Sequence, residues 1–205
     1  MSYIDTFKLS VLEQAVELSI SQEYKRVRTD RRYTLLMVGA FDTNKGQIEL
    51  LKTVRQIKLS GNDIHVYLVG PDIGEMQTCK TYIHINQLDN MVEILPFTED
   101  VAHCYSLSDV VLVCSQVETF GRVAVEAQLC GLPVILSNVG ANPERIEDGV
   151  NGLLYAKGNV DDLYHKIETL RSDNLRRQFA GNIDVVHLKK KYSVAEFAVR
   201  FSSII

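Results

Sequence analysis

Two glutamates that flank a Phe-Gly pair are the most chemically suggestive feature of the sequence. They are Glu118 and Glu126, in the stretch Glu118-Thr-Phe120-Gly121-Arg122-Val-Ala-Val-Glu126. A helix that begins near Gly121 would leave backbone N–H groups of Phe120, Gly121 and Arg122 available to an anion such as a diphosphate. Carboxylates accept hydrogen bonds, and sugar hydroxyls are suitable donors. The pattern predicts a pocket at a helix N-terminus, with Glu118 in the preceding loop.

Glu126 has a second interpretation. It lies in the apolar frame Val123–Ala127, where an unpaired buried carboxylate would cost several kcal/mol. Arg122, four residues earlier, could pair with it on the same helical face. Local pairing explains one carboxylate, but it does not explain the combination of glycines, glutamates and Phe-Gly.

A second candidate loop, Val38–Gly46, reads V-G-A-F-D-T-N-K-G. Gly39 follows an apolar run and would let a ligand approach the backbone. Lys45 and Gly46 come next to a helical pattern, which places an ammonium group beside free N–H groups and favours a phosphate. The alternative is an ordinary turn with a solvated lysine. The loop has neither the G-x-G-x-x-G fingerprint nor a Walker A pattern.

Two further loops carry weaker signals. Gly70 ends the apolar run Y-L-V-G and indicates either a simple turn or a cleft lined by backbone. Pro96-Phe97-Thr98 follows another apolar run, where main-chain groups could bind a nucleotide base and Phe97 could flank it. The alternative there is a core Phe97 and a helix capped by Thr98.

The elements that must position these loops alternate along the chain. Short Val-, Ile- and Leu-rich runs are separated by helical patterns, which is typical of βαβ units and a parallel sheet covered on both faces. We therefore predict an α/β fold, a Rossmann-like doubly wound parallel sheet of about six strands, with a helical tail over 159–205 and an N-terminal helix and connector over 1–32. The expected strands are Tyr33–Val38, His65–Val69, Val92–Leu95, Val110–Cys114, Pro133–Leu136 and Gly152–Tyr155, and the expected helices between them are Gly46–Leu59, Glu75–Leu88, Asp100–Leu107, Arg122–Cys130 and Glu144–Glu147.

Composition limits the class of protein. The 205 residues are the size of one domain, and 22 basic against 26 acidic side chains leave a net charge of −4. This balance argues against a nucleic-acid binder or a basic membrane-surface binder. Apolar runs are too short to span a bilayer and no leader is evident, so we expect a cytoplasmic protein. The four cysteines show no C-x-x-C pair and no histidine at zinc-site offsets, so we expect no metal site. Cys114 and Cys130 lie in apolar runs and are expected to pack as small buried hydrophobes; the alternative, a catalytic thiolate, has no activating His or Lys nearby in the sequence.

The glutamate stretch resembles the donor-binding half of the retaining group 1 glycosyltransferases of GT-B fold. Their motif E-x-F-G-x-x-x-x-E-A, followed by G-x-P-V, is met here by Glu118, Phe120, Gly121 and Glu126, and by Gly131 and Pro133. The resemblance covers about Tyr33 to Ser203. It implies that Glu118 contacts the transferred sugar, Glu126 the ribose, Lys45 the diphosphate, and Leu95–Phe97 the base of a UDP- or GDP-sugar, without a metal.

The chain departs from that family in two ways. The usual Gly-Arg after the first strand is here Gly39-Ala40, so Arg122 or a residue elsewhere must replace an arginine–phosphate contact worth roughly 1.5–3 kcal/mol. The usual Gly-Gly is Gly140-Ala141, and Glu144 is kept. The family also has a preceding acceptor-binding domain, for which residues before Tyr33 leave no room.

These departures support several hypotheses. The first is the nucleotide-sugar-binding domain of a hexosyltransferase of polysaccharide or glycolipid biosynthesis, inactive in isolation. It would meet its carbohydrate or lipid-linked acceptor, and any membrane surface, only through the missing half. The second is a non-catalytic or split-enzyme subunit that docks a separate acceptor domain through an amphipathic helix at Asp5–Arg28. A sugar phosphorylase or epimerase fits the glutamate spacing less well.

Overall fold

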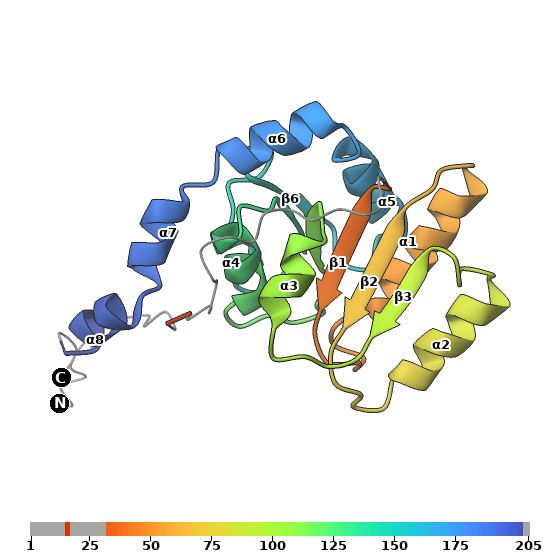
Figure 1. Cartoon of the computed structure of the whole chain (residues 1–205), viewed down its shortest axis with the longest axis horizontal. Helices are drawn as coiled ribbons and strands as arrows, with labels where there is room; N and C mark the ends of the chain where they lie inside the picture. The colour runs from red at the N-terminus through yellow and green to blue at the C-terminus, as the bar shows by residue number, and fades with distance from the viewer. Residues whose placement is uncertain (1–14, 17–31, 203–205) are drawn as a thin grey trace, which may run out of the picture.

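The computed structural model describes residues 15–16 and 32–202, and its centre is a parallel sheet of six strands (Figure 1). Every neighbouring pair is parallel, in the order β3-β2-β1-β4-β5-β6. The order reverses between β1 and β4, so the chain winds outward in both directions from the centre. The strands are β1 (Thr34–Val38), β2 (His65–Val69), β3 (Val92–Leu95), β4 (Val110–Val113), β5 (Val134–Ser137) and β6 (Gly152–Tyr155).

Helices cover both faces of this sheet. Alternate strand residues point to opposite faces, so Leu35 and Met37 pack with α1, α2 and α5, whereas Leu36 packs with α3 and α4. Figure 1 shows α3 in front of the sheet and α1 behind it. The helices are α1 (Gln47–Leu59), α2 (Met76–Ile85), α3 (Val101–Ser106), α4 (Arg122–Leu129), α5 (Val160–Thr169), α6 (Asp173–Gly181), α7 (Val185–Lys191) and α8 (Val194–Ser202), with a 3₁₀ turn, η1 (Asn142–Glu144).

The predicted fold class is confirmed. The structure has the six expected strands, and each boundary differs from the prediction by at most one residue. The strands could be predicted because a sheet buried on both faces requires continuous apolar runs. After β6 the described chain is helical through Ser202, as predicted for the tail. In Figure 1 this tail runs from α5 past α4 and ends in α8.

Three local predictions are wrong. The helix expected at Glu144–Glu147 is the 3₁₀ turn η1, with Pro143 in its first turn, and the chain then turns toward β6. Thr98 does not cap α3, since the side chain of Asp100 accepts the cap bond from the His103 N–H. Val16 lies in neither helix nor strand, and its N–H donates to the carbonyl oxygen of Tyr192 at 2.9 Å. The rest of the expected helix Asp5–Arg28, and the boundary at residue 32, lie outside the described residues or remain untested.

The tail packs against the core through α7. Leu188 contacts a small cluster of Val16, Val125, Leu129 and Tyr192, which joins α7 to α4. None of the helices over residues 32–202 has the length and apolar character needed to cross a membrane.

Candidate functional site

The predicted site residues gather where the strand order reverses. β1 and β4 are neighbours, and the chain leaves them toward helices on opposite faces. In open parallel sheets, ligands usually bind in a crevice at the carboxyl ends of the strands where the order reverses, and we call the region between the loops after β1 and β4 the crevice. The loop of Lys45 follows β1 and the loop of Glu118 follows β4.

Lys45 and Glu118 form an ion pair across this crevice. The Lys45 Nζ lies 3.5 Å from Glu118 Oε2, with the two side chains 30% and 15% exposed. Ser115 Oγ also donates to Oε2, at 3.2 Å, and the Gly121 N–H donates to Oε1 at 3.2 Å. Glu118 therefore lies in the loop before α4, as predicted, and its carboxylate faces both a cation and a helix N-terminus.

The Glu118 loop is held from behind by the segment after β5. The Ala141 N–H donates to the Glu118 carbonyl oxygen at 2.9 Å. Gly140 has φ +49°, and a Cβ placed there would come within 1.9 Å of that same oxygen. Gly140 therefore allows the two segments to approach closely at the Glu118 carbonyl oxygen, and Ala141 in place of a second glycine does not prevent this approach.

Asn44 fixes the same loop from the β1 side, a role that the sequence reasoning missed. Its Oδ1 accepts from the Val117 N–H at 2.9 Å, its Nδ2 donates to the Val117 carbonyl at 3.2 Å, and its own carbonyl accepts from the Gln116 N–H at 2.6 Å. An asparagine directly before Lys45 was the available signal, but its partners lie more than 70 residues away. These bonds set the position of Lys45 relative to Glu118.

Gly46 joins the start of α1 to the end of β4. It is the N-cap residue of α1 with φ +78°, and a Cβ on it would lie 2.2 Å from the Cys114 carbonyl oxygen. No L-residue with a side chain fits there without displacement of the backbone. Lys45 and Gly46 therefore precede a helix of 13 residues whose first N–H groups have no acceptor within the helix.

Glu126 lies inside α4 with its carboxylate engaged by two side chains. Arg122 Nε donates to Oε1 at 2.6 Å, and the Tyr105 hydroxyl donates to Oε2 at 2.8 Å. The local pairing with Arg122 is thus present, and Tyr105 is a partner that the sequence did not reveal. Burial, with the nearby Glu126 charge, raises the pKa of Tyr105 well above its usual value, so the hydroxyl remains a donor.

Gly39 and Gly70 meet each other at the ends of β1 and β2. The Gly39 N–H donates to the Val69 carbonyl at 2.9 Å, and a Cβ on Gly70 would lie 2.0 Å from the Gly39 carbonyl oxygen. The small size of Gly70 is therefore needed for contact between the two loops, whereas the nearest atoms to a Cβ on Gly39 would be those of the Lys45 side chain, at 3.4 Å. Gly39 is half-buried and Gly70 is buried.

Phe120 anchors the loop before α4 to the tail. Its ring packs edge-on against Tyr192, with centroids 5.9 Å apart, and the Arg145 guanidinium lies over it at 5.1 Å. The Gly121 N–H is taken by Glu118. The N–H groups of Ala124 and Val125 donate to the Gly121 carbonyl oxygen at 3.0 and 3.3 Å. The first-turn N–H groups left without an acceptor in the helix are therefore those of Arg122 and Val123.

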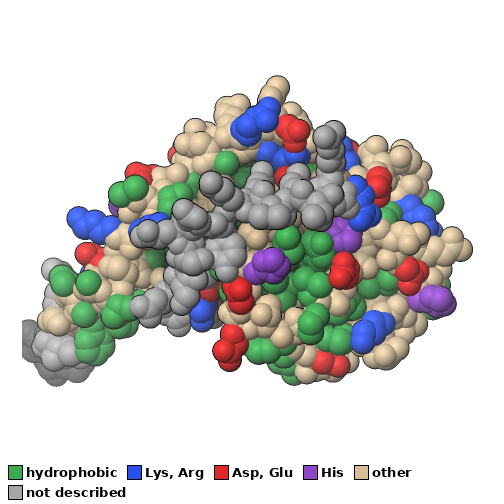
Figure 2. All heavy atoms as spheres, in the orientation of Figure 1, with side chains coloured by type: hydrophobic (Ala, Val, Ile, Leu, Met, Phe, Trp, Pro, Cys, Tyr) green, Lys and Arg blue, Asp and Glu red, His purple; other side chains and the backbone are tan. Residues whose placement is uncertain are grey.

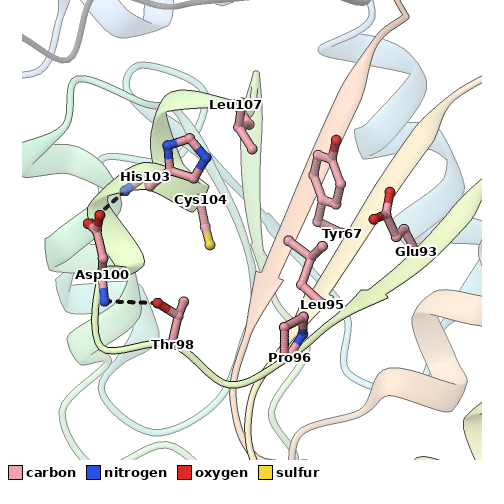
Figure 3. A pocket seen from close by; sticks show the side chains of 9 residues that line it. All are labelled: Tyr67, Glu93, Leu95, Pro96, Thr98, Asp100, His103, Cys104 and Leu107. Carbon is pink, nitrogen blue, oxygen red and sulfur yellow. Dashed lines mark hydrogen bonds between the residues drawn. The ribbon is translucent and has the colours of Figure 1, made fainter.

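The β3–α3 loop borders a cavity of about 360 Å³ between α3 and the strands β2 and β3. Figure 3 shows Tyr67, Leu95 and Pro96 on the strand side and Cys104 on the helix side. Phe97 does not line this cavity, and it is 63% exposed. The interpretation of Phe97 as a core residue is therefore wrong, and its ring is accessible at the edge of the sheet. The remaining lining residues are Glu93, Thr98, Asp100, His103 and Leu107.

The cysteines behave as packing residues. Burial raises the pKa of the thiols of Cys114 and Cys130 to about 12 and that of Cys79 to about 11. No group of three His, Cys, Asp or Glu side chains in the described parts of the chain could hold a metal ion. The predicted independence of a metal remains a prediction.

A family comparison covers most of this architecture. The model of the family described as glycosyl transferases group 1 matches residues 21–184. Among the solved structures, HepE from Anabaena in complex with UDP and glucose superposes with a TM-score of 0.76 at 26% identity, over 84% of this chain and 47% of that one.

Curated relatives also match most of this chain. A 41.2 kDa protein of the cps region of Klebsiella pneumoniae, described as uncharacterized, is 29% identical over 85% of this chain and 51% of its own length. The capsular polysaccharide biosynthesis glycosyltransferase CapM of Staphylococcus aureus is 25% identical over 85% of this chain and 46% of its length. The chain therefore spans about half the length of the curated relatives it matches.

Proposed function

Since this chain belongs to the group 1 glycosyltransferases, we propose that residues 33–205 bind the nucleotide-sugar donor of a retaining hexosyltransferase. The reaction would break the bond between the anomeric carbon and the diphosphate and form one to an acceptor hydroxyl, which loses its proton. Polysaccharide or glycolipid biosynthesis is the proposed setting, in line with CapM, which is described as a capsular polysaccharide biosynthesis glycosyltransferase. The acceptor would be bound by a domain that corresponds to the part of the curated relatives' sequences that this chain does not match.

The Lys45–Glu118 pair at the switch point carries this proposal. Lys45 would neutralise the diphosphate together with the first N–H groups of α4. Glu118 faces the same crevice from β4, where its carboxylate would accept hydrogen bonds from the hydroxyls of the transferred sugar. Fixed donors of this kind stabilise a departing diphosphate, so we propose that no metal is required.

The nucleoside would extend across the carboxyl ends of β1 and β2 toward β3. Neighbouring strands lie about 4.8 Å apart, so the β3–α3 loop is about 10 Å from β1, a distance that a ribose and a base can span. The backbone at Gly39 and Gly70 lies along this path. Main-chain groups near Pro96 would bind the base, and the exposed ring of Phe97 would stack on it.

Glu126 remains our candidate for the ribose. A carboxylate offers about four acceptor positions, and two are taken by Arg122 and Tyr105. A ribose hydroxyl at the start of α4 would use one of the others. Its small exposed area makes this the most demanding contact of the proposed site.

Calorimetric titration of the chain with UDP, UDP-glucose, GDP and GDP-mannose, with EDTA present, tests the proposal. We expect saturable binding of one nucleotide and of its sugar. Absence of binding by all four ligands would overturn the donor-site proposal. A requirement for a divalent ion would overturn the metal-independent form of it.

The alternative is a non-catalytic or split-enzyme subunit that binds nucleotide sugar and docks a separate acceptor domain. It is motivated by Ala40, which supplies no arginine to the diphosphate. Copurification from native extract of a discrete partner of about 170–200 residues would favour the split enzyme. Sugar transfer by the 205-residue chain alone would contradict both versions in which the chain is half of an enzyme.

A further inference from the structure

The proposed diphosphate site has a deficit of positive charge on its β1 side. Ala40 supplies no side-chain contact there, and Lys45 already shares its ammonium with Glu118. A diphosphate carries more negative charge than one partly neutralised lysine can offset. We therefore consider which neighbouring elements supply a second cation, and the start of α4 is one of them, since the loop of Glu118 leads directly into it.

Arg145 lies below the start of α4 but is committed elsewhere. Its side chain is 2% exposed, and its Nη1 donates to the Tyr192 hydroxyl at 2.6 Å. Nη2 pairs with Glu144, and the guanidinium lies over the ring of Phe120. It stabilises the junction of loop and tail, and a ligand in the crevice would not reach it.

Arg122 has the opposite character. It is the first residue of α4, and its side chain is 64% exposed. Within residues 32–202 its guanidinium is bonded through Nε alone, to Glu126 at 2.6 Å. Nη1 and Nη2 have no hydrogen bond within those residues, and Arg122 belongs to the first turn of α4, where the positive end of the helix dipole also favours an anion.

A buried network fixes this guanidinium. Glu126 is 5% exposed on its side chain, and the buried hydroxyl of Tyr105 holds its other oxygen at 2.8 Å. The carboxylate therefore cannot rotate without losing a buried hydrogen bond. A guanidinium that is bonded through Nε still has two parallel N–H groups, one on each Nη, that can donate to a phosphate. An ammonium group has no such planar pair of donors.

We infer that Arg122 is the second cation of the diphosphate subsite, and that Glu126, braced by Tyr105, is the positioning residue that holds it there. This inference rests on the proposed function. It adds to the ribose role of Glu126 a separate one that acts on the diphosphate through Arg122.

The test compares UDP with uridine, because only UDP carries the diphosphate. Dissociation constants are measured by NMR titration of the 205-residue chain and of its Arg122→Gln, Arg122→Lys and Glu126→Gln variants, with Arg55→Gln as an exposed control from α1. We expect Arg122→Gln to lower the affinity ratio of UDP to uridine about ten- to hundred-fold. Arg122→Lys should recover part of the ratio, and Arg55→Gln should not change it.

The positioning role has its own readout. Glu126→Gln should lower the UDP-to-uridine ratio in the wild-type background but not in the Arg122→Gln background, since the two changes act through one contact. An unchanged ratio in Arg122→Gln would overturn the inference while leaving the proposed function intact. No binding of UDP by the unmodified chain would instead overturn the proposed function.

Discussion

The Lys45 ammonium lies 3.5 Å from the Glu118 carboxylate, although 73 residues separate them in the chain. The pairing arises because β1 and β4 are adjacent and each strand ends in a loop that another element holds in place. Asn44 and Gly140 provide those restraints on the two sides of Glu118. The two side chains are 30% and 15% exposed, so the pair remains partly accessible to a ligand that would replace one of the partners.

Replacement of Lys45 should weaken nucleotide binding through the phosphates. Lys45→Ala removes the ammonium that faces the diphosphate, so we expect the affinity for UDP to fall about ten-fold or more, with less effect on uridine. Titration calorimetry measures both. Lys52→Ala, which removes an exposed lysine of the same helix, is the matched control, and an equal loss in the two variants would contradict the assignment.

Glu118 should affect the sugar more than the nucleotide. Glu118→Gln removes the carboxylate charge but keeps the size of the side chain. We expect the affinity for the nucleotide sugar to fall, while that for UDP stays equal or rises as Lys45 is freed from its partner. Parallel titrations with UDP and UDP-glucose measure this difference. A larger loss for UDP than for UDP-glucose would place Glu118 away from the sugar.

The contact of Gly46 with β4 should make this position intolerant of alanine. Gly46→Ala combines a left-handed φ with a Cβ 2.2 Å from the Cys114 carbonyl, whereas Gly61 has φ +80° and open space around it. Gly61→Ala should cost about 1–2 kcal/mol for the backbone conformation alone. Gly46→Ala should lower the free energy of unfolding by about 1–3 kcal/mol more, from overpacking. Urea denaturation distinguishes the two, and equal losses would mean that the contact is not tight.

Phe97 should contribute to base binding and little to stability. Its side chain is 63% exposed, and Ile85, at the far end of α2, is 71% exposed. We expect Phe97→Ala to weaken uridine binding about five-fold or more, since base–aromatic stacking contributes roughly 1–3 kcal/mol. Ile85→Ala should leave it unchanged, and neither variant should shift the thermal midpoint appreciably. Loss of stability without loss of uridine affinity in Phe97→Ala would contradict the assignment.

The buried thiols should resist alkylation and should destabilise the fold at alkaline pH. With pKa values of about 12 for Cys114 and about 11 for Cys79, these buried thiols stay protonated at pH 8, so iodoacetamide should label them slowly until urea is added. The unfolded chain ionises first, at about pH 8.5–9, so the stability from the protonated thiols is complete below that pH. It is lost as the pH rises toward the folded values.

Urea midpoints at pH 8 and 9.5 should show this loss, and Cys114→Ala should reduce its slope with pH. Rapid labelling of the native chain at pH 8 would contradict the account of buried thiols. A midpoint that rises with pH over this interval would also contradict it.

The local pattern of the sequence was sufficient for the strands and for the position of Glu118. Each apolar run of four to six residues can be identified as a strand from its own sequence. A residue that directly follows such a run lies at the carboxyl edge of a parallel sheet, where ligands usually bind. The exposure of Phe97 could not be predicted, because an aromatic residue after a strand is equally compatible with the core and with the surface. Periodicity does not distinguish the two.

The parts that could not be predicted depend on contacts between distant segments. Tyr105 reaches Glu126 across two helices on the same face of the sheet, and Asn44 reaches Val117 between two loops. Neither pair has a spacing that a sequence pattern could reveal. The packing of Tyr192 on Phe120 depends likewise on where the tail returns to the body.

Hydrogen exchange of the chain with and without saturating UDP tests the central claim most directly, since it reports where the nucleotide binds. We predict slower exchange in the loops 39–46 and 115–122 and at the β3–α3 loop, with no change in α6 or α8. Saturable binding that protects another surface, or that leaves the loops after β1 and β4 unprotected, would contradict the account.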